Sequence, residues 1–326
     1  MEDLKSQVQK LLRKYGNRGY RIAKAHVLQD KRIITPIRPI LRYLIEECWP
    51  NMQHPALISL ACEAVGGKPE APDEVSAGIV LLTGAADMHD DIVDKSRAKG
   101  SLPTAYGKFG SDLVLLAGDI LLLKALTQLN CALARYPLKT QNTIRRLVES
   151  SFYELGTATA AERTYKRKLD VDPAKYRELI NRKGAVAEAC ARIGAIIGRG
   201  SIEEIEAMGT FGRALGVLMT LNHEFHDMSD SAELNNRWKN ETLPLPIFYA
   251  FQDKESKHDI LCLMTGRMTK RKANGIASAA MKTAEVEKLK ADMIYMARDS
   301  AENTLRKIQA NKRHFALLLR LAVEGL

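Results

Sequence analysis

The sequence contains no long apolar run. None of its stretches approaches the roughly 18 uncharged apolar residues that are needed to span a bilayer. The first ten residues, MEDLKSQVQK, also lack the basic-then-apolar order of a secretory signal. We therefore expect no transmembrane segment and a cytoplasmic location, with peripheral contact to a membrane left open.

Paired cysteine motifs are missing as well. The five cysteines are scattered, odd in number and free of CxxC spacing, which argues against a disulfide framework or a zinc site. They are typical of reduced, mostly buried small side chains in a cytoplasmic protein. The positions are Cys48, Cys62, Cys131, Cys190 and Cys262.

Strand-like alternation is the third absence, because helix-period patterning dominates the whole chain. We find no low-complexity linker and no internal repeat, so the sequence predicts one all-α domain over residues 1–326, with basic helices in 1–33. The expected helices are 2–15, 18–31, 38–49, 55–65, 73–95, 111–135, 138–167, 173–199, 202–231, 243–252, 256–265, 285–310 and 313–324. The segment 184–198 is so rich in Ala and Gly that it indicates close helix–helix approach.

The net charge is +10, and part of the excess lies in the first 32 residues. Such patches can attract nucleic acid, anionic lipid or an acidic partner. No zinc finger, RNA-binding aromatic motif or helix-turn-helix accompanies them, so we do not expect a nucleic-acid partner. A solvated helix face is the simplest explanation, and a basic cavity for phosphates would also raise the count.

The segment from His89 to Asp94 carries the most chemical information. Asp90 and Asp94 are four residues apart and lie on one side of a predicted helix, with Asp91 beside them. Three like charges on one turn repel each other unless cations neutralise them. Mg²⁺ accepts carboxylate oxygens and takes phosphate oxygens as further ligands, so this pattern favours a diphosphate held through magnesium. The alternative is a solvated acidic turn at a helix end.

A second acidic cluster ends the predicted helix 202–231. His223, Glu224 and Asp227 could share a face there, at the polar end of an apolar helix. Two acidic clusters at matching depths on two core helices would form a magnesium cage around one diphosphate. The alternative is a polar helix end without a ligand.

The order of these motifs resembles the trans-isoprenyl diphosphate synthase (polyprenyl synthetase) family over most of the chain. Asp90-Asp91-Ile92-Val93-Asp94 fits the first aspartate-rich motif of that family. The motifs that follow it in family order are Pro103-Thr104, Phe109-Gly110, Leu116 to Asp119, Tyr176 with Ile180 and Lys183, Gly212 to Gly216, and Lys239 with Thr242-Leu243-Pro244. The resemblance implies a large bundle of the isoprenoid synthase type, with about 12 to 14 helices around a central cavity, and usually a dimer.

Three motifs depart from the family pattern. The second DDxxD is replaced by His223-Glu224-Phe225-His226-Asp227, which keeps only the last aspartate. Of the basic residues that ordinarily hold isopentenyl diphosphate, the second substrate, Arg38 alone survives near the N-terminus, and an Arg-Arg-Gly triplet is reduced to Lys99-Gly100-Ser101. The second-substrate site is therefore weakened, whereas the allylic-diphosphate site is better preserved.

The resemblance also assigns roles to single residues. Asp90 and Asp94 would bind metal with Asp91 in support, and Asp227 with Glu224 would bind a further ion, giving two or three Mg²⁺ ions in all. Lys183 and Lys239 would contact the leaving diphosphate, and Arg38, Arg97 and Lys99 would form what remains of the second site. The C–O bond would ionise to an allylic cation, which the alkene of isopentenyl diphosphate attacks in a cavity that excludes water.

Product length depends on the helix that precedes Asp90. Family members with short products tend to carry bulky aromatic residues four and five positions upstream, where this chain has Ala86 and Ala85. Two alanines leave the floor open, so we predict an apolar tunnel and a product or ligand of about twenty carbons or more. Leu81 or Leu82 would form the next floor.

Three functions are compatible with these residues. The first is a prenyltransferase that condenses an allylic diphosphate with isopentenyl diphosphate. The second is a weakly active or non-catalytic subunit of a heteromeric polyprenyl diphosphate synthase. The third is a class I terpene synthase-like enzyme that ionises a prenyl diphosphate without elongation, for which Asp227, Ser231 and Asn235 echo the spacing of a metal-binding triad.

Overall fold

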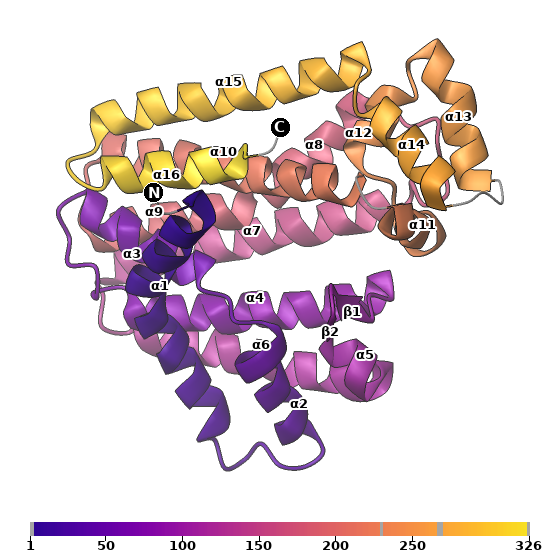
Figure 1. Ribbon diagram of the computed structural model, residues 1–326. Helices are drawn as coiled ribbons and strands as arrows, with labels where there is room; N and C mark the ends of the chain where they lie inside the picture. Colours follow the sequence, from indigo (N-terminus) through magenta and orange to yellow (C-terminus); the bar gives the residue numbers. More distant parts are fainter. Residues whose placement is uncertain (1–2, 229–230, 266–269, 325–326) are drawn as a thin grey trace. The chain divides into compact units, whose positions relative to one another are not determined.

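The structure is a computed structural model that describes residues 3–228, 231–265 and 270–324. These residues form sixteen α-helices, one short π-helix and one two-stranded hairpin (Figure 1). The all-α prediction is confirmed. The helices outnumber the 12 to 14 expected because three short ones were not predicted, α5 (Ala105–Phe109), α11 (Ser231–Asn240) and α14 (Lys270–Ala280).

The chain divides into two compact units, and the boundaries between them fall inside helices or at their ends. Unit 1 comprises Met1–Leu147, Cys190–Met208 and Ile308–Lys312, and unit 2 comprises Val148–Ala189, Gly209–Lys307 and Arg313–Leu326. The helices that contribute several residues to both units are α7 (Leu138–Arg163), α9 (Ala185–Ile197) and α10 (Ile202–Met228). The expectation of one domain over 1–326 stays a prediction.

Unit 1 is built around α4 (Asp73–Asp94), which packs against α1, α3 and α6. Residues 75–85 of α4 are buried without interruption, as expected for a helix that neighbours cover on several sides. The remaining elements of this unit are α1 (Leu4–Leu28), α2 (Ile37–Tyr43), the π-helix η1 (Leu44–Cys48), α3 (Gln53–Ala64), β1 (Ala98–Lys99), β2 (Leu102–Pro103) and α6 (Ser111–Leu133).

Unit 2 has an aromatic core. Phe211 of α10 meets Phe315 of α16 edge to face at 4.8 Å, and Tyr176 of α8 meets Phe248 of α12 at 5.2 Å. The short helix α12 contacts both α8 and α15. The elements that belong to this unit, besides α11 and α14, are α8 (Pro173–Lys183), α12 (Leu245–Ala250), α13 (Lys254–Thr265), α15 (Ala284–Lys307) and α16 (Lys312–Ala322).

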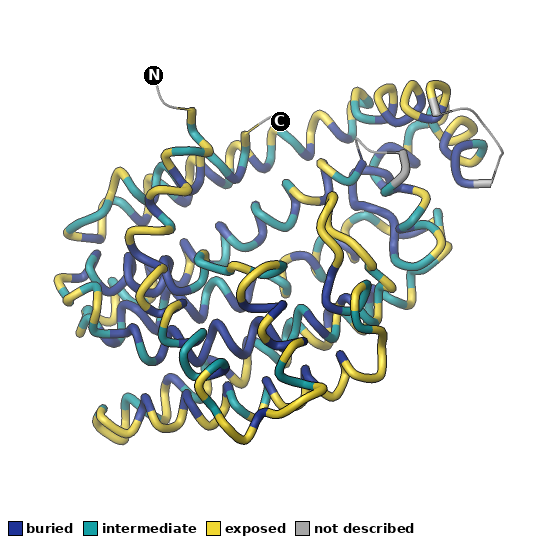
Figure 2. The backbone as a smooth tube through the Cα atoms, turned by 60° about the horizontal axis from the view of Figure 1, so that its bottom comes forward, coloured by how far each residue is buried: buried dark blue, intermediate teal, exposed yellow. Residues whose placement is uncertain are grey.

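Most of the helices are amphipathic. Figure 2 shows buried and exposed residues following each other around the turns of individual helices. Among the described residues, no helix has the length and apolar character needed to cross a membrane. All five cysteines are free.

Two expected helix boundaries were wrong. The predicted break after residue 15 does not occur, because α1 continues through Gly16, where an added Cβ would lie 2.4 Å from the Met52 carbonyl oxygen. This glycine serves close packing and does not end the helix. The predicted helix 173–199 is divided at Gly184 into α8 and α9.

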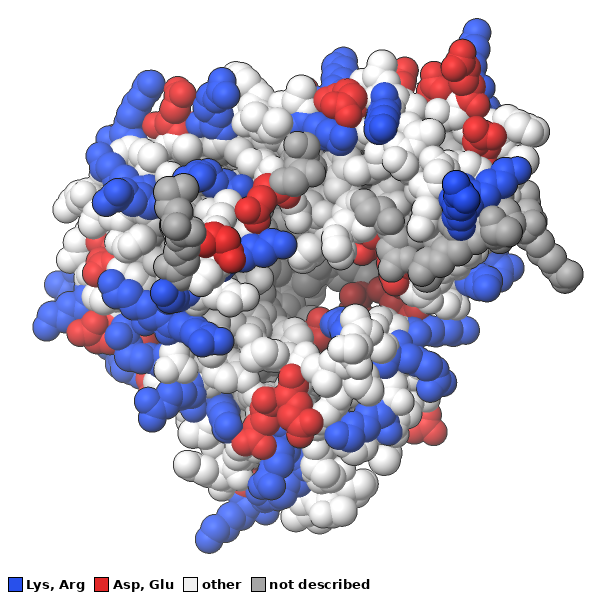
Figure 3. All heavy atoms as spheres, viewed as in Figure 1, with Lys and Arg blue, Asp and Glu red and all other residues white. Residues whose placement is uncertain are grey.

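The basic residues near the N-terminus are spread along α1. Several have acidic partners: Arg18 donates to Asp73 at 2.8 Å, and Lys24 lies 2.9 Å from Glu46. On the face shown in Figure 3, Lys and Arg side chains are interspersed with acidic and uncharged ones. This arrangement suits the solvated helix face that the sequence favoured.

Close approach of α9 to α3 depends on Gly194, where an added Cβ would lie 2.2 Å from the backbone oxygen of Ile58. Gly194→Ala should therefore lower the free energy of unfolding by about 1–3 kcal/mol through overpacking. The matched control is Gly156→Ala on an exposed part of α7, where nothing lies within 4 Å of the added Cβ. This control should stabilise by roughly 0.5–1 kcal/mol through helix propensity. Urea unfolding measures both, and effects of the same sign would contradict the packing argument.

Candidate functional site

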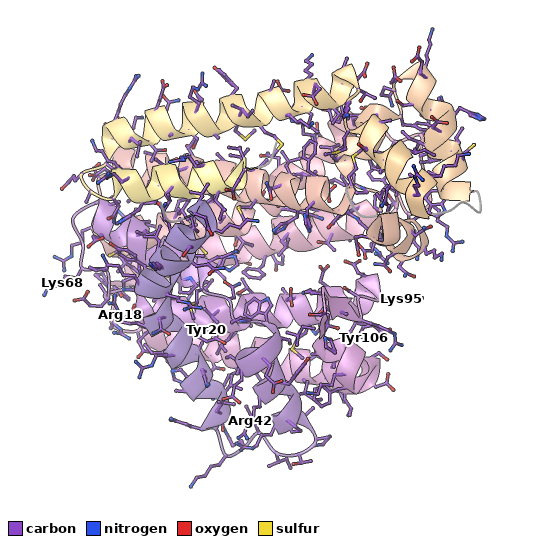
Figure 4. The ribbon with its side chains drawn as sticks, viewed as in Figure 1. Arg18, Tyr20, Arg42, Lys68, Lys95 and Tyr106 are labelled. Carbon is purple, nitrogen blue, oxygen red and sulfur yellow. The ribbon has the colours of Figure 1, made fainter. Side chains whose placement is uncertain are left out.

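Unit 1 presents acidic residues at the C-terminal end of α4. Asp90 is exposed and Asp94 half-buried, four residues apart on this helix. Asp91 lies between them in sequence but is buried, with 5% of its surface exposed. The three aspartates thus divide into an outward pair and an inward residue. In Figure 4 the labels Lys95, directly after α4, and Tyr106, on α5, mark this end of unit 1.

The inward aspartate, Asp91, forms an ion-pair group with Asp87 and Lys99. The sequence had predicted Asp91 beside the metal ligands and Lys99 at the second-substrate site. The Lys99 ammonium lies 2.8 Å from Asp87 Oδ1 and 3.1 Å from Asp91 Oδ1. Burial raises the pKa of Asp91 to about 7, although the charge of Lys99 opposes that rise. Asp87 was missed, yet its spacing of four from Asp91 was visible in the sequence. Lys99, expected at the second-substrate site, pairs here with carboxylates.

The loop after α4 is fixed by backbone hydrogen bonds. Lys95 ends the helix in the left-handed conformation with φ 58°, and Ser96 N–H donates to the Asp91 carbonyl at 2.9 Å. The Thr104 hydroxyl donates to the Ser96 carbonyl at 2.7 Å and accepts from Gly107 N–H at 2.9 Å. The Pro103-Thr104 motif therefore caps α5 and holds the chain that follows the acidic turn.

His89 turns toward α6. Its Nε2 lies 3.3 Å from Asp119 Oδ1, and a Cβ at Gly118 would come within 2.5 Å of that nitrogen. The motif Leu116 to Asp119 therefore lies next to the first acidic motif, with Gly118 making room for the imidazole.

The two arginines expected at the second-substrate site have local partners. Arg38 donates to the backbone carbonyls of Leu28 at 3.0 Å and Asp30 at 2.9 Å, so it closes the C-terminal end of α1. Arg97 is exposed, and its guanidinium lies 5.1 Å from the centre of the Tyr106 ring. Their role toward a diphosphate stays a prediction.

The alanines expected to set product length lie deeper in α4. Ala85 is buried and Ala86 half-buried. Leu81 and Leu82, one turn further from the acidic end, are both buried. Next to Ala85, a Cβ at Gly84 would lie 3.2 Å from the Trp49 ring. Gly84, at this level of α4, thus lies near a large aromatic residue from the chain that precedes α3.

The second acidic region, which we define as Glu224 and Asp227 of α10, belongs to unit 2. Arg237 of α11 donates to Asp227 Oδ2 and to Glu224 Oε1, each at 2.9 Å, and its Nε donates to the Thr242 carbonyl at 2.9 Å. The other oxygen of Glu224 accepts from Leu245 N–H at 2.6 Å. Glu224 therefore ties α10 to α11 and to the start of α12.

A second buried pair adjoins this region. Glu162 of α7 accepts a hydrogen bond from the Tyr176 hydroxyl and forms an ion pair with Lys183. Arg237 Nη2 lies 3.9 Å from the same carboxylate. Burial opposes ionisation of Glu162, but Lys183 and Arg237 outweigh it and hold its pKa below the usual value. Because the folded pKa is lowered, this stabilisation is present above the usual carboxylate pKa and is lost as the pH falls through the folded value.

Arg237 is charged at any relevant pH. Burial opposes its charge, yet the surrounding acidic groups, with Glu224 first, raise its pKa well above the usual value. Its side chain is 6% exposed. A buried guanidinium of this kind is tolerated only where acidic partners surround it, as Glu224 and Asp227 do here.

Three further residues that the sequence analysis singled out in this region are exposed. His223, His226 and Lys239 are all exposed, so His223 does not share the buried face of Glu224. The side chain of Ser231, part of the proposed triad, lies outside the described residues.

A divalent ion fits the two regions differently. Asp90 and Asp94 offer oxygen ligands on one side of an accessible helix end, which suits Mg²⁺. Both carboxylate oxygens of Glu224 already accept hydrogen bonds, so a metal ion would have to share them with Arg237 and Leu245, and the role of Glu224 as an ion ligand stays a prediction. Within the described residues no group of three or more His, Cys, Asp or Glu is arranged to hold an ion by itself. The joint cage of Asp90 with Asp227 stays a prediction.

Breaking the Arg237 network should destabilise the fold. Glu224→Gln leaves a buried guanidinium with less compensating charge, so the free energy of unfolding should fall by roughly 3 kcal/mol. The control Glu178→Gln, on an exposed position of α8, should change it by less than about 0.5 kcal/mol. Chemical denaturation at neutral pH measures both variants. Equal effects would show that Glu224 is not a structural anchor.

Comparison with known proteins gives the family. Residues 50–298 match the family described as polyprenyl synthetase. The chain is 29% identical over 231 residues to the short chain isoprenyl diphosphate synthase of Methanothermobacter thermautotrophicus, covering 70% of this chain and 68% of the relative. It is 28% identical over 239 residues to the geranylgeranyl diphosphate synthase of Sulfolobus acidocaldarius, covering 72% and 69%.

Solved structures agree on the fold. The geranylgeranyl pyrophosphate synthetase of Pyrococcus horikoshii superimposes with a TM-score of 0.82 at 22% identity, over 98% of this chain and 100% of that one. A polyprenyl synthase of Caulobacter crescentus, complexed with calcium and isoprenyl diphosphate, gives 0.79 at 16% identity, over 96% and 97%. The predicted family, isoprenoid synthase fold and enzyme class are thereby confirmed. The chain belongs to the polyprenyl synthetase family and is a transferase of the prenyl diphosphate synthase kind.

Proposed function

We propose that this transferase binds an allylic diphosphate through Mg²⁺ at Asp90 and Asp94 and condenses it with isopentenyl diphosphate. The observation that carries the proposal is the outward carboxylate pair at the end of α4, beside the inward group that Lys99 neutralises. A bound divalent ion would supply Lewis-acid stabilisation of the departing diphosphate. We extend the proposal to a cytoplasmic location, which suits the five free cysteines.

The side chains of the motif have distinct tasks in this proposal. Asp90 and Asp94 orient the diphosphate at the helix end. Lys99 pairs with the inward carboxylates, so the protein itself supplies a cation for them. Arg38, Arg97 and Lys239 remain proposed contacts of the two diphosphates.

We propose a product of C20 or longer. The support is that α4 carries alanine at positions 85 and 86, about one turn below its acidic end. Elongation is then limited further down the helix, where Leu81 and Leu82 are buried.

A second candidate function is a weakly active or non-catalytic subunit of a heteromeric synthase. Arg237 favours it, because a neutralised second acidic region leaves fewer groups to stabilise a departing diphosphate. Exposed apolar residues on α6 are compatible with pairing to a second copy or to a related subunit, since apolar surface of this kind marks interaction sites. They are Leu113, Leu115, Leu116, Ile120, Leu123 and Leu126.

Product analysis separates the candidates. The purified protein is incubated with Mg²⁺ and labelled allylic diphosphates, with and without isopentenyl diphosphate. We expect elongation to C20 or longer. Products of only ten to fifteen carbons would contradict the open floor at Ala85 and Ala86. Activity that appears only after addition of a second family member would support the subunit function, and diphosphate release without elongation would support the terpene synthase alternative.

Removal of the outward carboxylates tests the diphosphate site. Asp90→Ala combined with Asp94→Ala should abolish Mg²⁺-dependent binding of an allylic diphosphate, measured by calorimetry, because the ion loses its protein ligands. The control is Glu255→Ala with Asp259→Ala, an exposed acidic pair with the same spacing on α13, which should leave the affinity unchanged. Unchanged affinity in the Asp90/Asp94 variant would refute the proposed site.

A further inference from the structure

We propose that Arg237 is the built-in counter-cation of the second acidic region and takes the place of a divalent ion there. The inference rests on the proposed function only in its comparison with the metal site at Asp90 and Asp94. Its own basis is the buried network of unit 2.

The geometry of Arg237 matches that of a bridging cation. Its two terminal nitrogens each donate to a different carboxylate of α10, Asp227 and Glu224, at the same distance of 2.9 Å. Bridging two carboxylates from one side is what a metal ion between them would do. The planar guanidinium achieves this with directed N–H groups and without coordinated water.

Both carboxylate oxygens of Glu224 already have protein donors. Its second oxygen accepts from Leu245 N–H, and the residue is only 5% exposed. Mg²⁺ sheds water reluctantly and usually keeps several water ligands. An ion ligated by Glu224 would compete with the hydrogen bonds from Arg237 and Leu245 at a buried carboxylate, so Arg237 is favoured over the ion.

The position of the guanidinium supports the same conclusion. Arg237 lies within 4 Å of four carboxylates, those of Glu162, Glu224, Asp227 and Glu241. A divalent ion ligated by Glu224 would therefore lie next to this buried guanidinium. The cost of such like-charge contact is high in a buried, weakly polar environment.

Arg237 also orders the chain around it. Its Nε donates to the Thr242 carbonyl, which precedes α12, while Glu224 holds the first N–H of that helix. In addition, the Thr242 hydroxyl donates to the Glu162 carbonyl at 2.7 Å. The connection from α11 to α12 is therefore fixed by side chains of the protein itself. It requires neither a metal ion nor a diphosphate.

Titration with Mn²⁺ tests the proposal. Binding to the purified full-length protein is followed by electron paramagnetic resonance, with no diphosphate present. Asp227→Asn in the otherwise unchanged protein should leave both the number of bound ions and their affinity the same. Arg237→Met should add one Mn²⁺ site, and Asp227→Asn in that background should remove it or weaken it by roughly tenfold or more.

Two controls define the outcome. Arg177→Met removes a half-exposed arginine that pairs with Asp292 at 3.2 Å, and it should add no ion. Circular dichroism verifies that the variants are folded. The proposal is overturned if Asp227→Asn alone lowers the number of bound ions, a result that does not depend on whether Arg237→Met folds. It is also overturned if folded Arg237→Met gains no site.

Failure of this inference can be told apart from failure of the proposed function. The proposed function fails if Asp90→Ala with Asp94→Ala leaves Mg²⁺-dependent binding of the allylic diphosphate unchanged. The Arg237 inference fails through the Asp227 and Arg237 variants alone, which concern residues of α10 and α11 and are assayed without diphosphate.

Discussion

Neutralisation of buried acidic groups is the constraint on which the functional regions of this protein depend. Carboxylates at the end of a core helix cannot stay charged inside a protein without nearby cations. In unit 1 Lys99 meets this requirement for Asp87 and Asp91. In unit 2 the requirement is met by Arg237 for Glu224 and Asp227, and by Lys183 for Glu162. All three cations belong to the chain itself.

These pairings give the acidic residues of unit 2 a structural role. Glu224 links three helices, and Glu162 fastens α7 to α8 through Tyr176 and Lys183. Asp90 and Asp94 lie at the C-terminal end of α4, where Asp90 is exposed and Asp94 half-buried, and we propose that they hold an ion and a substrate phosphate there. The two acidic motifs of this polyprenyl synthetase relative are therefore not equivalent, and we infer that diphosphate binding depends mainly on the first.

The sequence predicted the fold and the first motif because both depend on local periodicity. The burial of residues 75–85 and the outward pair Asp90 and Asp94 follow from helix geometry, and α4 begins and ends within one residue of the expected 73–95. The family itself followed from the order of the motifs. The same reasoning located Glu224 and Asp227 on α10 and noticed that the second motif was degenerate.

Other features escaped the sequence because they depend on contacts between distant segments. Arg237 lies thirteen residues after Glu224, in a short helix without clear apolar periodicity, so its pairing could not be deduced from spacing. The pairing of Lys99 with Asp87 and Asp91 could not be predicted, because the hairpin of β1 and β2 brings Lys99 to these carboxylates. The continuation of α1 through Gly16 could not be predicted either, because the contact of this glycine, Met52, is 36 positions away in sequence.

The most direct test of this difference between the two acidic motifs is to locate the ions themselves. Crystals grown with Mn²⁺ and a non-reactive allylic diphosphate analogue would reveal each ion by its anomalous scattering. The account predicts ions on Asp90 and Asp94, with Arg237 still bonded to Glu224 and Asp227. An ion ligated by Asp227 or Glu224, with Arg237 displaced from them, would contradict it.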